Sequence, residues 1–184
     1  YIHATCQNEK NHLIQLGVDE NKIKIIPHGV EVQKNFVKKF NKEKKNMIFF
    51  SRIHPKKGLL ELIKVWNKLD HINEWQLNIY GPVSDHDYLK KINKEIKNKN
   101  LENYIKILDP VYDQFKKNYI YKNSDCFILP SRSENFGISI AEALSFGLPV
   151  LTTTDTPWKI INEQNAGFVF EFSEKNLLNN LNKL

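Results

Sequence analysis

Short apolar runs alternate with longer amphipathic stretches along most of this 184-residue chain, and this alternation constrains the fold more than any other feature. Each apolar run suits one buried strand, and each amphipathic stretch is long enough for a helix. The predicted strands are residues 47–50, 75–80, 104–108, 126–129, 149–153 and 168–170. The predicted helices are residues 58–69, 86–97, 112–123, 138–146, 158–164 and 173–184.

Strands that alternate with helices of this length build βαβ units, and successive units form a parallel sheet with helices on its faces. Each crossover between parallel strands is expected to be right-handed. We therefore predict an α/β fold, a Rossmann-like doubly wound parallel sheet. Ligands of such sheets bind beyond the carboxyl ends of the strands, and the polar motifs described below all follow strand ends.

The first 40 residues differ from the rest of the chain. Residues 1–5 and 23–26 predict short strands, residues 8–16 predict a helix, and residues 31–45 are polar and rich in lysine. This is too little material for a domain with its own core. We therefore predict that residues 1–40 are the tail of an N-terminal domain with an interdomain linker, and that residues 41–184 form the Rossmann-like domain.

The net charge of +6 comes from lysine, because all but two of the 27 basic residues are lysines. A surface that recognises nucleic-acid sequence usually favours arginine, because its planar guanidinium can donate two hydrogen bonds to one base. We therefore interpret the charge as a solvated surface, with weak attraction to an anionic membrane or to phosphate-bearing substrates as the alternative. No apolar run approaches the length of about 18 residues that a transmembrane helix needs.

The two cysteines, Cys6 and Cys126, lie far apart in the sequence and have no partner spacing. No zinc or redox motif is present. This pattern predicts reduced thiols in a cytosolic protein, with Cys126 as a small core residue in an apolar strand.

Residues 134–142 read Glu-Asn-Phe-Gly-Ile-Ser-Ile-Ala-Glu, so seven residues separate two glutamates, and four residues separate the segment from the strand at 126–129. A strand that passes through a glycine turn into a helix forms an anion site, because the first helical turn has N–H groups without partners. Two carboxylates would repel a bare anion. They suit a ligand that carries hydroxyls as well as phosphate, such as a nucleotide-sugar, because a carboxylate is a strong acceptor for O–H donors.

An alternative treats the glutamates as ordinary surface charges. Glu134 would then complement the helix dipole, and Glu142 would lie on an exposed helix face. The neighbours of Glu142 argue against this, because residues 140, 141, 143 and 144 are small or apolar. A charge in such surroundings is expected to have a specific partner.

Residues 51–58, Ser-Arg-Ile-His-Pro-Lys-Lys-Gly, link the first strand of the predicted domain to its first helix. Arg52 and Lys57 are placed to approach a diphosphate from two sides of one loop, and both residue types are common phosphate ligands. A solvated basic loop is the alternative. Lys56 is interpreted as a spare exposed charge.

Residues 85–87, Asp-His-Asp, resemble the metal-binding pattern of a different class of sugar transferase. Two carboxylates are a thin ligand set, and Ser84 or Asp85 is better interpreted as the cap of the following helix. We predict no metal site. The chain also has no G-x-G-x-x-G after the first strand and no P-loop, which argues against a dehydrogenase or an NTPase.

Together these motifs resemble a retaining glycosyltransferase of family four, a group 1 glycosyltransferase with the two-domain GT-B fold. The pattern Arg-x4-Lys-Gly matches residues 52–58, and Pro-Ser-x-x-Glu-x-Phe-Gly-x4-Glu-Ala matches residues 130–143. Gly-x-Pro-Val matches residues 147–150, and Pro-His-Gly-Val at 27–30 is similar to the Pro-Asn-Gly-Val hinge of the family. The amino-acid sequence of residues 134–144 is similar to that of lipopolysaccharide- and capsule-type members of the family.

The resemblance implies that this chain is the C-terminal, donor-binding half of such an enzyme. It implies transfer of a hexose from a UDP- or GDP-sugar to a glycan or lipid-linked acceptor, with retention and without a metal or other cofactor. The acceptor would bind an N-terminal domain across a cleft, so the isolated chain is expected to bind donor and transfer sugar poorly. The expected setting is surface polysaccharide assembly in the cytoplasm, with contact at the inner membrane face and no nucleic-acid partner.

The resemblance also implies roles for individual residues. Arg52 and Lys57 would hold the donor diphosphate, and Glu134 would accept hydrogen bonds from the transferred sugar. The donor-binding residues would be Asn135, Phe136, Gly137, Ile138 and Ser139 through backbone N–H groups, Glu142 through the ribose hydroxyls, and Val111 near the base. All of these groups are expected around one crevice.

Two further function classes stay open at this point. One is a non-catalytic nucleotide or nucleic-acid binding module on the same sheet, which would bind DNA or RNA with steep salt dependence. The other is a phosphorylase-like or epimerase relative with the same two-domain architecture.

Overall fold

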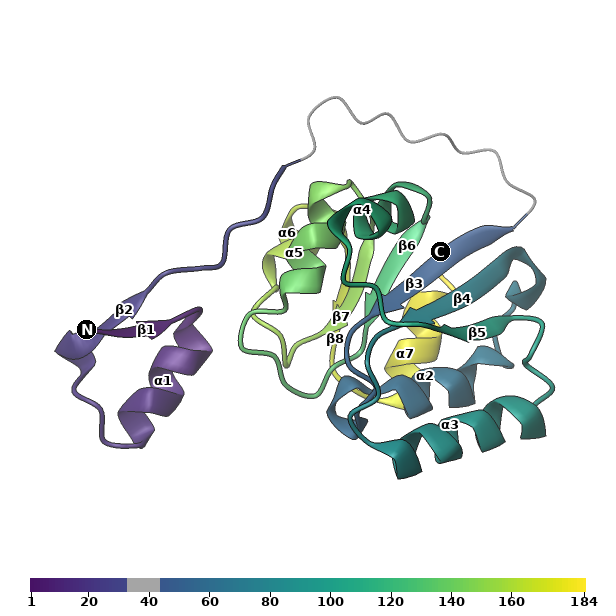
Figure 1. Ribbon diagram of the computed structural model, residues 1–184, viewed down its shortest axis with the longest axis horizontal. Coiled ribbons are helices and arrows are strands. Elements are labelled where there is room, and N and C mark those ends of the chain that lie inside the picture. Colours follow the sequence, from purple (N-terminus) through teal and green to yellow (C-terminus); the bar gives the residue numbers. More distant parts are fainter. Residues whose placement is uncertain (33–43) are drawn as a thin grey trace.

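The computed structural model describes residues 1–32 and 44–184 (Figure 1). Its main body is a six-stranded sheet in the spatial order β5-β4-β3-β6-β7-β8, with every neighbouring pair parallel. The strands are β3 (Lys45–Phe50), β4 (Trp75–Tyr80), β5 (Ile105–Leu108), β6 (Cys126–Leu129), β7 (Val150–Thr153) and β8 (Gly167–Phe170). The predicted doubly wound parallel sheet is confirmed. Strand order reverses between β3 and β6, and such a switch point opens a crevice at the carboxyl ends of the strands.

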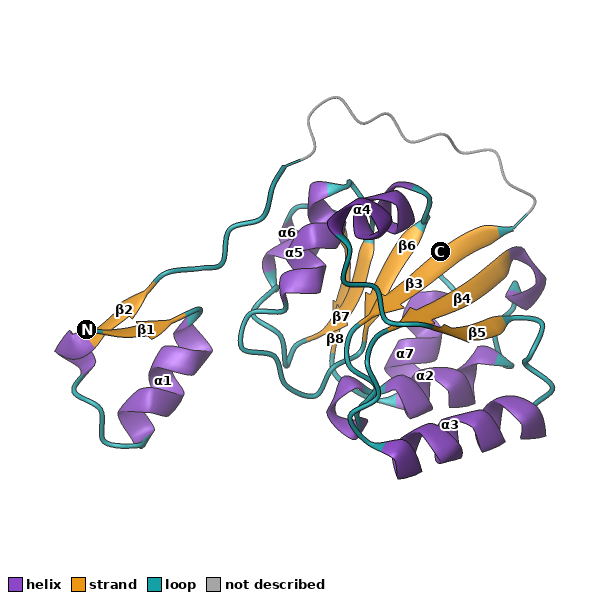
Figure 2. Cartoon of the chain, in the orientation of Figure 1, coloured by secondary structure: helices purple, strands orange, loops and turns teal. Residues whose placement is uncertain are grey.

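Helices cover both faces of the sheet, as Figures 1 and 2 show. One face carries α2 (Leu59–Trp66), α3 (His86–Asn98) and α7 (Glu174–Leu181). The other face carries α4 (Gln114–Lys122), α5 (Ile138–Ser145) and α6 (Ile160–Glu163). Short 3-10 turns at Pro55–Lys57 and Ile72–Glu74 precede α2 and β4.

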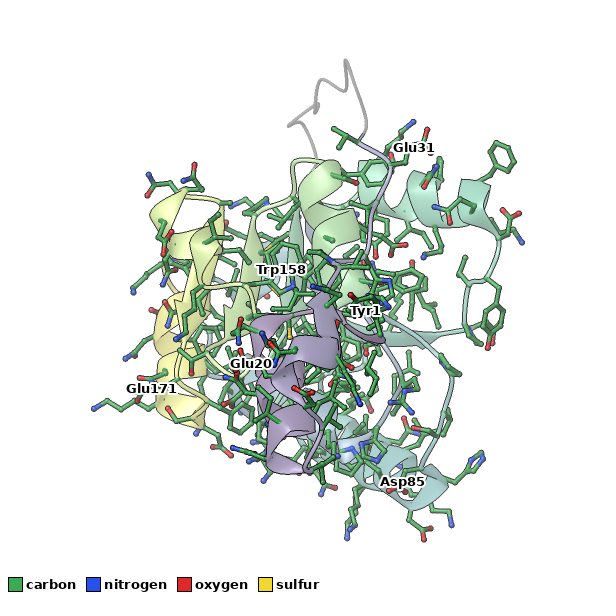
Figure 3. The ribbon with its side chains drawn as sticks, turned by 90° about the vertical axis from the view of Figure 1, so that its left-hand side faces the viewer. Tyr1, Glu20, Glu31, Asp85, Trp158 and Glu171 are labelled. Atoms are coloured by element: carbon green, nitrogen blue, oxygen red, sulfur yellow. The ribbon has the colours of Figure 1, made fainter. Side chains whose placement is uncertain are left out.

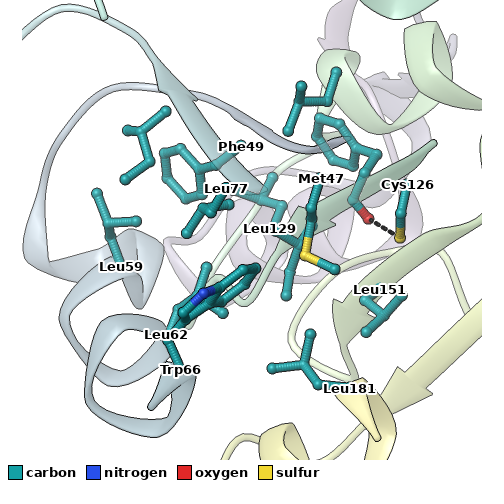
Figure 4. Packing of buried hydrophobic residues seen from close by; sticks show 14 of the residues in the cluster. Met47, Phe49, Leu59, Leu62, Trp66, Leu77, Cys126, Leu129, Leu151 and Leu181 are labelled. Atoms are coloured by element: carbon teal, nitrogen blue, oxygen red, sulfur yellow. Dashed lines mark hydrogen bonds between the residues drawn. The ribbon is translucent and has the colours of Figure 1, made fainter. Parts of the chain in front are cut away.

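The core lies between the sheet and the helices (Figure 4). Met47 and Leu77 from the strands meet Leu62 and Trp66 from α2 and Leu181 from α7, and all five are buried. Burial of one such side chain contributes about 1.5–3 kcal/mol. The apolar residues that predicted the strands are therefore the same residues on which the helices pack.

A glycine brings the loop after β3 against the end of β6. Gly58 has φ +67, and a Cβ at this position would lie 2.1 Å from the carbonyl oxygen of Pro130. Only glycine avoids both the left-handed strain and this clash. The N–H of Arg132 donates to the carbonyl of Lys56 at 2.7 Å, which joins the same two loops. The segments 51–58 and 130–137 are therefore held side by side.

Residues 1–32 form a small unit at the left of Figure 1. β1 (Ile2–Ala4), α1 (Gln7–Gln15), a 3-10 turn at Glu20–Lys22 and β2 (Ile23–Ile25) make one βαβ element, with β1 and β2 paired in parallel. The predicted boundary near residue 41 lies outside the described residues. The assignment of residues 1–40 to the tail of another domain and a linker stays a prediction.

None of the helices in the described ranges combines the length and the apolar character that crossing a membrane requires.

Candidate functional site

A cavity of about 470 Å³ lies where the loops after β3 and β6 meet, at the switch point of the sheet. We call it the Arg52 cavity. Seven residues predicted from the sequence line it: Arg52, Lys57, Glu134, Asn135, Phe136, Gly137 and Ile138. Two motifs that are about 80 residues apart in the chain therefore share one site, because their strands are neighbours in the sheet.

Lys57 and Glu134, which both line this cavity, form an ion pair. Lys57 Nζ lies 2.5 Å from Glu134 Oε1, and the two side chains are only 11% and 12% exposed. Arg52 is exposed and forms no ion pair with any described residue. The cavity thus offers one neutralised pair and one unpaired guanidinium.

The start of α5 adds free N–H donors beside these charges. The helix begins at Ile138, directly after Gly137 in the left-handed region with φ +78. The backbone N–H groups of residues 135–139 donate to no group in the described part of the chain. Unpaired N–H groups and the positive end of a helix dipole both favour a bound anion.

Contacts from the last residue of β7 and from the segment after it fix the loop that leads into α5. Trp158 Nε1 donates to the carbonyl of Phe136 at 2.5 Å, and the Phe136 ring packs edge-on against Trp158 at 5.3 Å between centroids. Thr153 Oγ1 donates to the carbonyl of Ser131, earlier in the same loop. Figure 3 views this side of the molecule, with Trp158 labelled. These contacts fix the position of this cavity wall.

A second cavity of about 290 Å³ contains Glu142. Ile138 lines both cavities, so they adjoin at the start of α5. Glu142 Oε1 lies 2.5 Å from Lys117 Nζ, and Glu142 Oε2 accepts a hydrogen bond from the Tyr121 hydroxyl at 2.9 Å. As its apolar neighbours predicted, Glu142 has specific partners, both from α4. Burial, together with the neighbouring Glu142 carboxylate, raises the pKa of Tyr121, which keeps this phenol a donor.

The remaining predicted residues lie farther from the cavities. Ser139 and Val111 line neither cavity; Val111 lies in the loop between β5 and α4. The expected single crevice is therefore two adjoining cavities, with Arg52, Lys57 and Glu134 in one and Glu142 in the other. The groups divide because Glu142 lies one turn inside α5, on a side of the helix that faces α4.

Asp85 caps α3, since its Oδ1 accepts a hydrogen bond from the N–H of Tyr88 at 2.8 Å, which confirms the capping interpretation. Within residues 1–32 and 44–184, no three or more His, Cys, Asp or Glu side chains are grouped to hold a metal ion. Cys6 and Cys126 are both buried, and neither belongs to a disulfide.

Sequence reasoning did not assign six residues that line the Arg52 cavity: Thr5, Glu9, His28, His54, Lys56 and Ser133. Glu9 accepts hydrogen bonds from the N–H of Thr5 at 2.6 Å, from Thr5 Oγ1 at 2.5 Å and from Asn135 Nδ2 at 2.8 Å. These bonds, with those from Thr5 the largest cause, lower the pKa of Glu9. No sequence signal marks Glu9 or Thr5, whereas His28 falls in the hinge-like motif at 27–30.

The model of the family described as Glycosyl transferases group 1 matches residues 31–184. Among curated proteins, the chain is similar to the GDP-mannose:cellobiosyl-diphosphopolyprenol alpha-mannosyltransferase of Xanthomonas oryzae. The two are 26% identical over 171 residues, which cover 91% of this chain and 44% of the relative. The chain spans half or less of the length of the curated relatives that it matches.

Two solved structures share the fold. The complex of Anabaena HepE with UDP and glucose has a TM-score of 0.82 at 22% identity, covering 98% of this chain and 52% of that one. WaaG, a glycosyltransferase involved in lipopolysaccharide biosynthesis, also has a TM-score of 0.82, at 17% identity and the same coverage. At these identities the likeness is evidence for the fold alone.

Proposed function

Because this chain belongs to the group 1 glycosyl transferases, we propose that it binds a nucleotide-sugar donor whose hexose is transferred to a glycan or lipid-linked acceptor. One observation carries the proposal: the Arg52 cavity combines an unpaired guanidinium, the Lys57–Glu134 pair and a helix start with free N–H groups. The Xanthomonas relative, named for GDP-mannose and a diphosphopolyprenol acceptor, supports the same substrate class.

The donor would extend across both cavities. Its diphosphate fits between Arg52, Lys57 and the start of α5, where cations and N–H groups face the same space. The transferred sugar would donate hydroxyl hydrogen bonds to Glu134. Because the two cavities adjoin at Ile138, the ribose would reach Glu142, with the base toward Val111.

Transfer requires that a nucleoside diphosphate leave as the glycosidic bond breaks, so negative charge grows on its oxygens. Arg52, Lys57 and the N–H groups of residues 135–139 stabilise that charge more in the transition state than in the ground state. These groups would supply the positive charge without a metal ion. We propose retention of configuration, in line with the family resemblance, and assign no protein nucleophile.

We propose further that this chain supplies the donor-binding half of the enzyme, since it spans about half the length of its relatives. The acceptor would then bind another domain, and this chain alone would bind donor with little transfer. The biological setting that fits is assembly of a surface polysaccharide such as lipopolysaccharide or capsule.

A thermal-shift panel of UDP-, GDP- and ADP-sugars tests the proposal. A ligand at about 100 times its Kd adds about 2.7 kcal/mol of stability, so one donor class should raise the Tm clearly. The Arg52→Ala variant should lose that shift. If no nucleotide-sugar stabilises the chain, and DNA or RNA binds with steep salt dependence, the non-catalytic nucleic-acid module is the better description.

A further inference from the structure

His54 belongs to the loop between β3 and α2, and it lines the Arg52 cavity. The residue before it, Ile53, is completely buried in the core, and its N–H donates to the carbonyl of Pro82 at 2.9 Å. Ile53 also forms a parallel bridge with Val83, so the chain is extended at this point. Side chains alternate between the two sides of an extended chain, which places Arg52 and His54 together on the side of the cavity.

The two ring nitrogens of His54 have different surroundings. Nδ1 lies 3.1 Å from the backbone nitrogen of Lys56, and because a backbone N–H can only donate, Nδ1 is an acceptor without a proton. A ring in this state is neutral and carries its single proton on Nε2. Nε2 has no hydrogen-bond partner among residues 1–32 and 44–184. The half-buried ring therefore offers one N–H group to a ligand.

The position of His54 in the backbone does not by itself require a histidine. His54 caps the 3-10 turn Pro55–Lys57 twice: its Nδ1 accepts from the N–H of Lys56, and its carbonyl accepts from the N–H of Lys57 at 2.9 Å. An asparagine would cap the turn in the same way, because its Oδ1, like Nδ1 of histidine, is attached to Cγ. What the imidazole adds is the second nitrogen, which lies farther from the backbone and carries the proton.

The groups around His54 favour an anionic ligand. Arg52 and Lys56 line the same cavity and are exposed, and Lys57 lines it as the partner of Glu134. Each of these cations belongs to the loop that His54 caps. A hydrogen bond from an N–H group to a charged oxygen is about twice as strong as one to a neutral acceptor. A phosphate oxygen is therefore the acceptor that suits the N–H group at Nε2.

We propose that His54 is a further residue that binds the diphosphate of the nucleotide-sugar. Nε2 donates a hydrogen bond to a phosphate oxygen, while Nδ1 holds the turn that carries Lys57. The proposal rests on the proposed function, because it needs a nucleoside diphosphate in the Arg52 cavity. Arg52, His54 and Lys57 then contact the ligand from one loop, and the histidine adds a hydrogen bond without adding another charge.

Isothermal titration calorimetry with UDP and GDP separates binding from capping. His54→Asn keeps the cap and removes the N–H group at Nε2, so the Tm should stay within about 1 °C of that of the unchanged chain. Its affinity for the nucleoside diphosphate that binds more tightly should fall about tenfold. Inorganic pyrophosphate, which has no base and no sugar, should show the same loss. His54→Ala also removes the side-chain cap, so its Tm should fall by about 2–4 °C and its affinity at least as much as in His54→Asn.

His71→Asn is the matched control. His71 also precedes a three-residue 3-10 turn, Ile72–Glu74, but its side chain does not cap that turn and it does not line the Arg52 cavity. The affinities for UDP, GDP and pyrophosphate should therefore equal those of the unchanged chain. A loss of nucleotide affinity that is specific to His54→Asn would not follow from removing a histidine before any turn.

Nuclear magnetic resonance provides a measurement that a purely structural role of His54 would not change. A two-bond proton–nitrogen correlation spectrum of the histidine rings, assigned with His54→Asn, should show Nδ1 of His54 without a proton. Addition of UDP or GDP should shift the Nε2 resonance of His54, whereas the resonances of His71 should stay in place.

Three results would overturn the proposal, and they are distinguishable from one another. If His54→Asn binds UDP or GDP as tightly as the unchanged chain, His54 is only a cap, and the proposed function stands. If His54→Asn weakens binding of a nucleotide-sugar but not of UDP, GDP or pyrophosphate, Nε2 contacts the sugar instead of the diphosphate. If the unchanged chain binds no nucleotide at all, the proposed function fails, and the role of His54 fails with it.

Discussion

The surroundings of Glu134 and of Glu142 look alike at first and differ in what they can do. Each carboxylate is largely buried, and each lies 2.5 Å from a lysine ammonium, Lys57 in one case and Lys117 in the other. Glu134 belongs to a loop beside the unpaired Arg52, whereas Glu142 belongs to a helix and has a second donor. The first pair can exchange partners with a charged ligand, while the second joins α4 to α5.

Arg52 should matter most for ligand binding, because its guanidinium lines the Arg52 cavity without an ion-pair partner among the described residues and can contact a diphosphate through two N–H groups at once. We expect Arg52→Ala to weaken binding of UDP or GDP about a hundredfold, or about 3 kcal/mol, with little change in stability. Isothermal titration calorimetry measures this directly. Arg132→Ala is the matched control, because Arg132 pairs with Glu61 and lies outside the Arg52 cavity. Equal losses in both variants would contradict the assignment of the diphosphate site.

Stability should respond more to Glu142 than to Glu134. Glu142→Ala removes the partner of Lys117 and leaves the Tyr121 hydroxyl only the carbonyl of Ser139 at 3.5 Å, and we expect the free energy of unfolding to fall by about 2 kcal/mol. Glu134→Ala leaves only Lys57, which faces an open cavity where water can replace the carboxylate, so about 1 kcal/mol is expected. Urea denaturation of both variants measures the difference.

A double variant separates the two roles of Glu142. Lys117→Met with Glu142→Leu removes both charges together and should recover most of the lost stability, since apolar pairs often replace buried ion pairs without cost. It should not recover nucleotide affinity. If Glu134→Ala and Glu142→Ala lower the free energy of unfolding equally, the contrast is wrong. The Lys57–Glu134 pair would then be as structural as the Lys117–Glu142 pair.

Tyr121 provides a smaller test of the same contrast. Tyr121→Phe removes one hydroxyl that donates to Glu142 and keeps the buried ring in place. We expect a loss of about 1 kcal/mol in the free energy of unfolding. Tyr119→Phe on the exposed side of α4 is the control and should lose almost nothing. A loss of the same size in both would mean that the Tyr121–Glu142 hydrogen bond contributes nothing specific.

Much of the fold follows from local pattern alone. β4 and β6 have the predicted bounds, 75–80 and 126–129, because each is a short apolar run between polar segments. α3 begins at His86 as predicted, since the Asp85 cap is readable in sequence. α6 is shorter than predicted and begins at Ile160, because the backbone bonds before it, from the N–H of Ile161 to the carbonyl of Trp158 and from the N–H of Asn162 to that of Lys159, span three residues instead of four.

The site residues also fall into those that the sequence could predict and those that it could not. Arg52, Lys57 and Glu134 could be predicted together because each follows a strand end, and parallel strands end at one edge of the sheet. Lys117 and Glu9 could not, because they reach the site from helices whose positions depend on packing. Lysine is also so abundant in this chain that one more on a helix carries no information.

The smallest expected effect concerns pH and the contact between α1 and the Glu134 loop. Hydrogen bonds, those from Thr5 foremost, lower the pKa of Glu9 from its ordinary value of 4.5. The ionised form is therefore favoured in the folded chain. Its contribution to stability is present above pH 4.5 and is lost as the pH falls through the lower pKa of the folded state.

Because Glu9 is partly exposed and screened by solvent, we expect that contribution to be about 0.5 kcal/mol or less. Urea denaturation at neutral pH and near pH 3 measures it. Glu9→Gln keeps the size of the side chain and should reduce the loss of stability on acidification, whereas Glu163→Gln, on an exposed position of α6, should not. An unchanged acid response in Glu9→Gln would mean that the hydrogen bonds to Glu9, those from Thr5 and Asn135, do not stabilise the folded chain in solution.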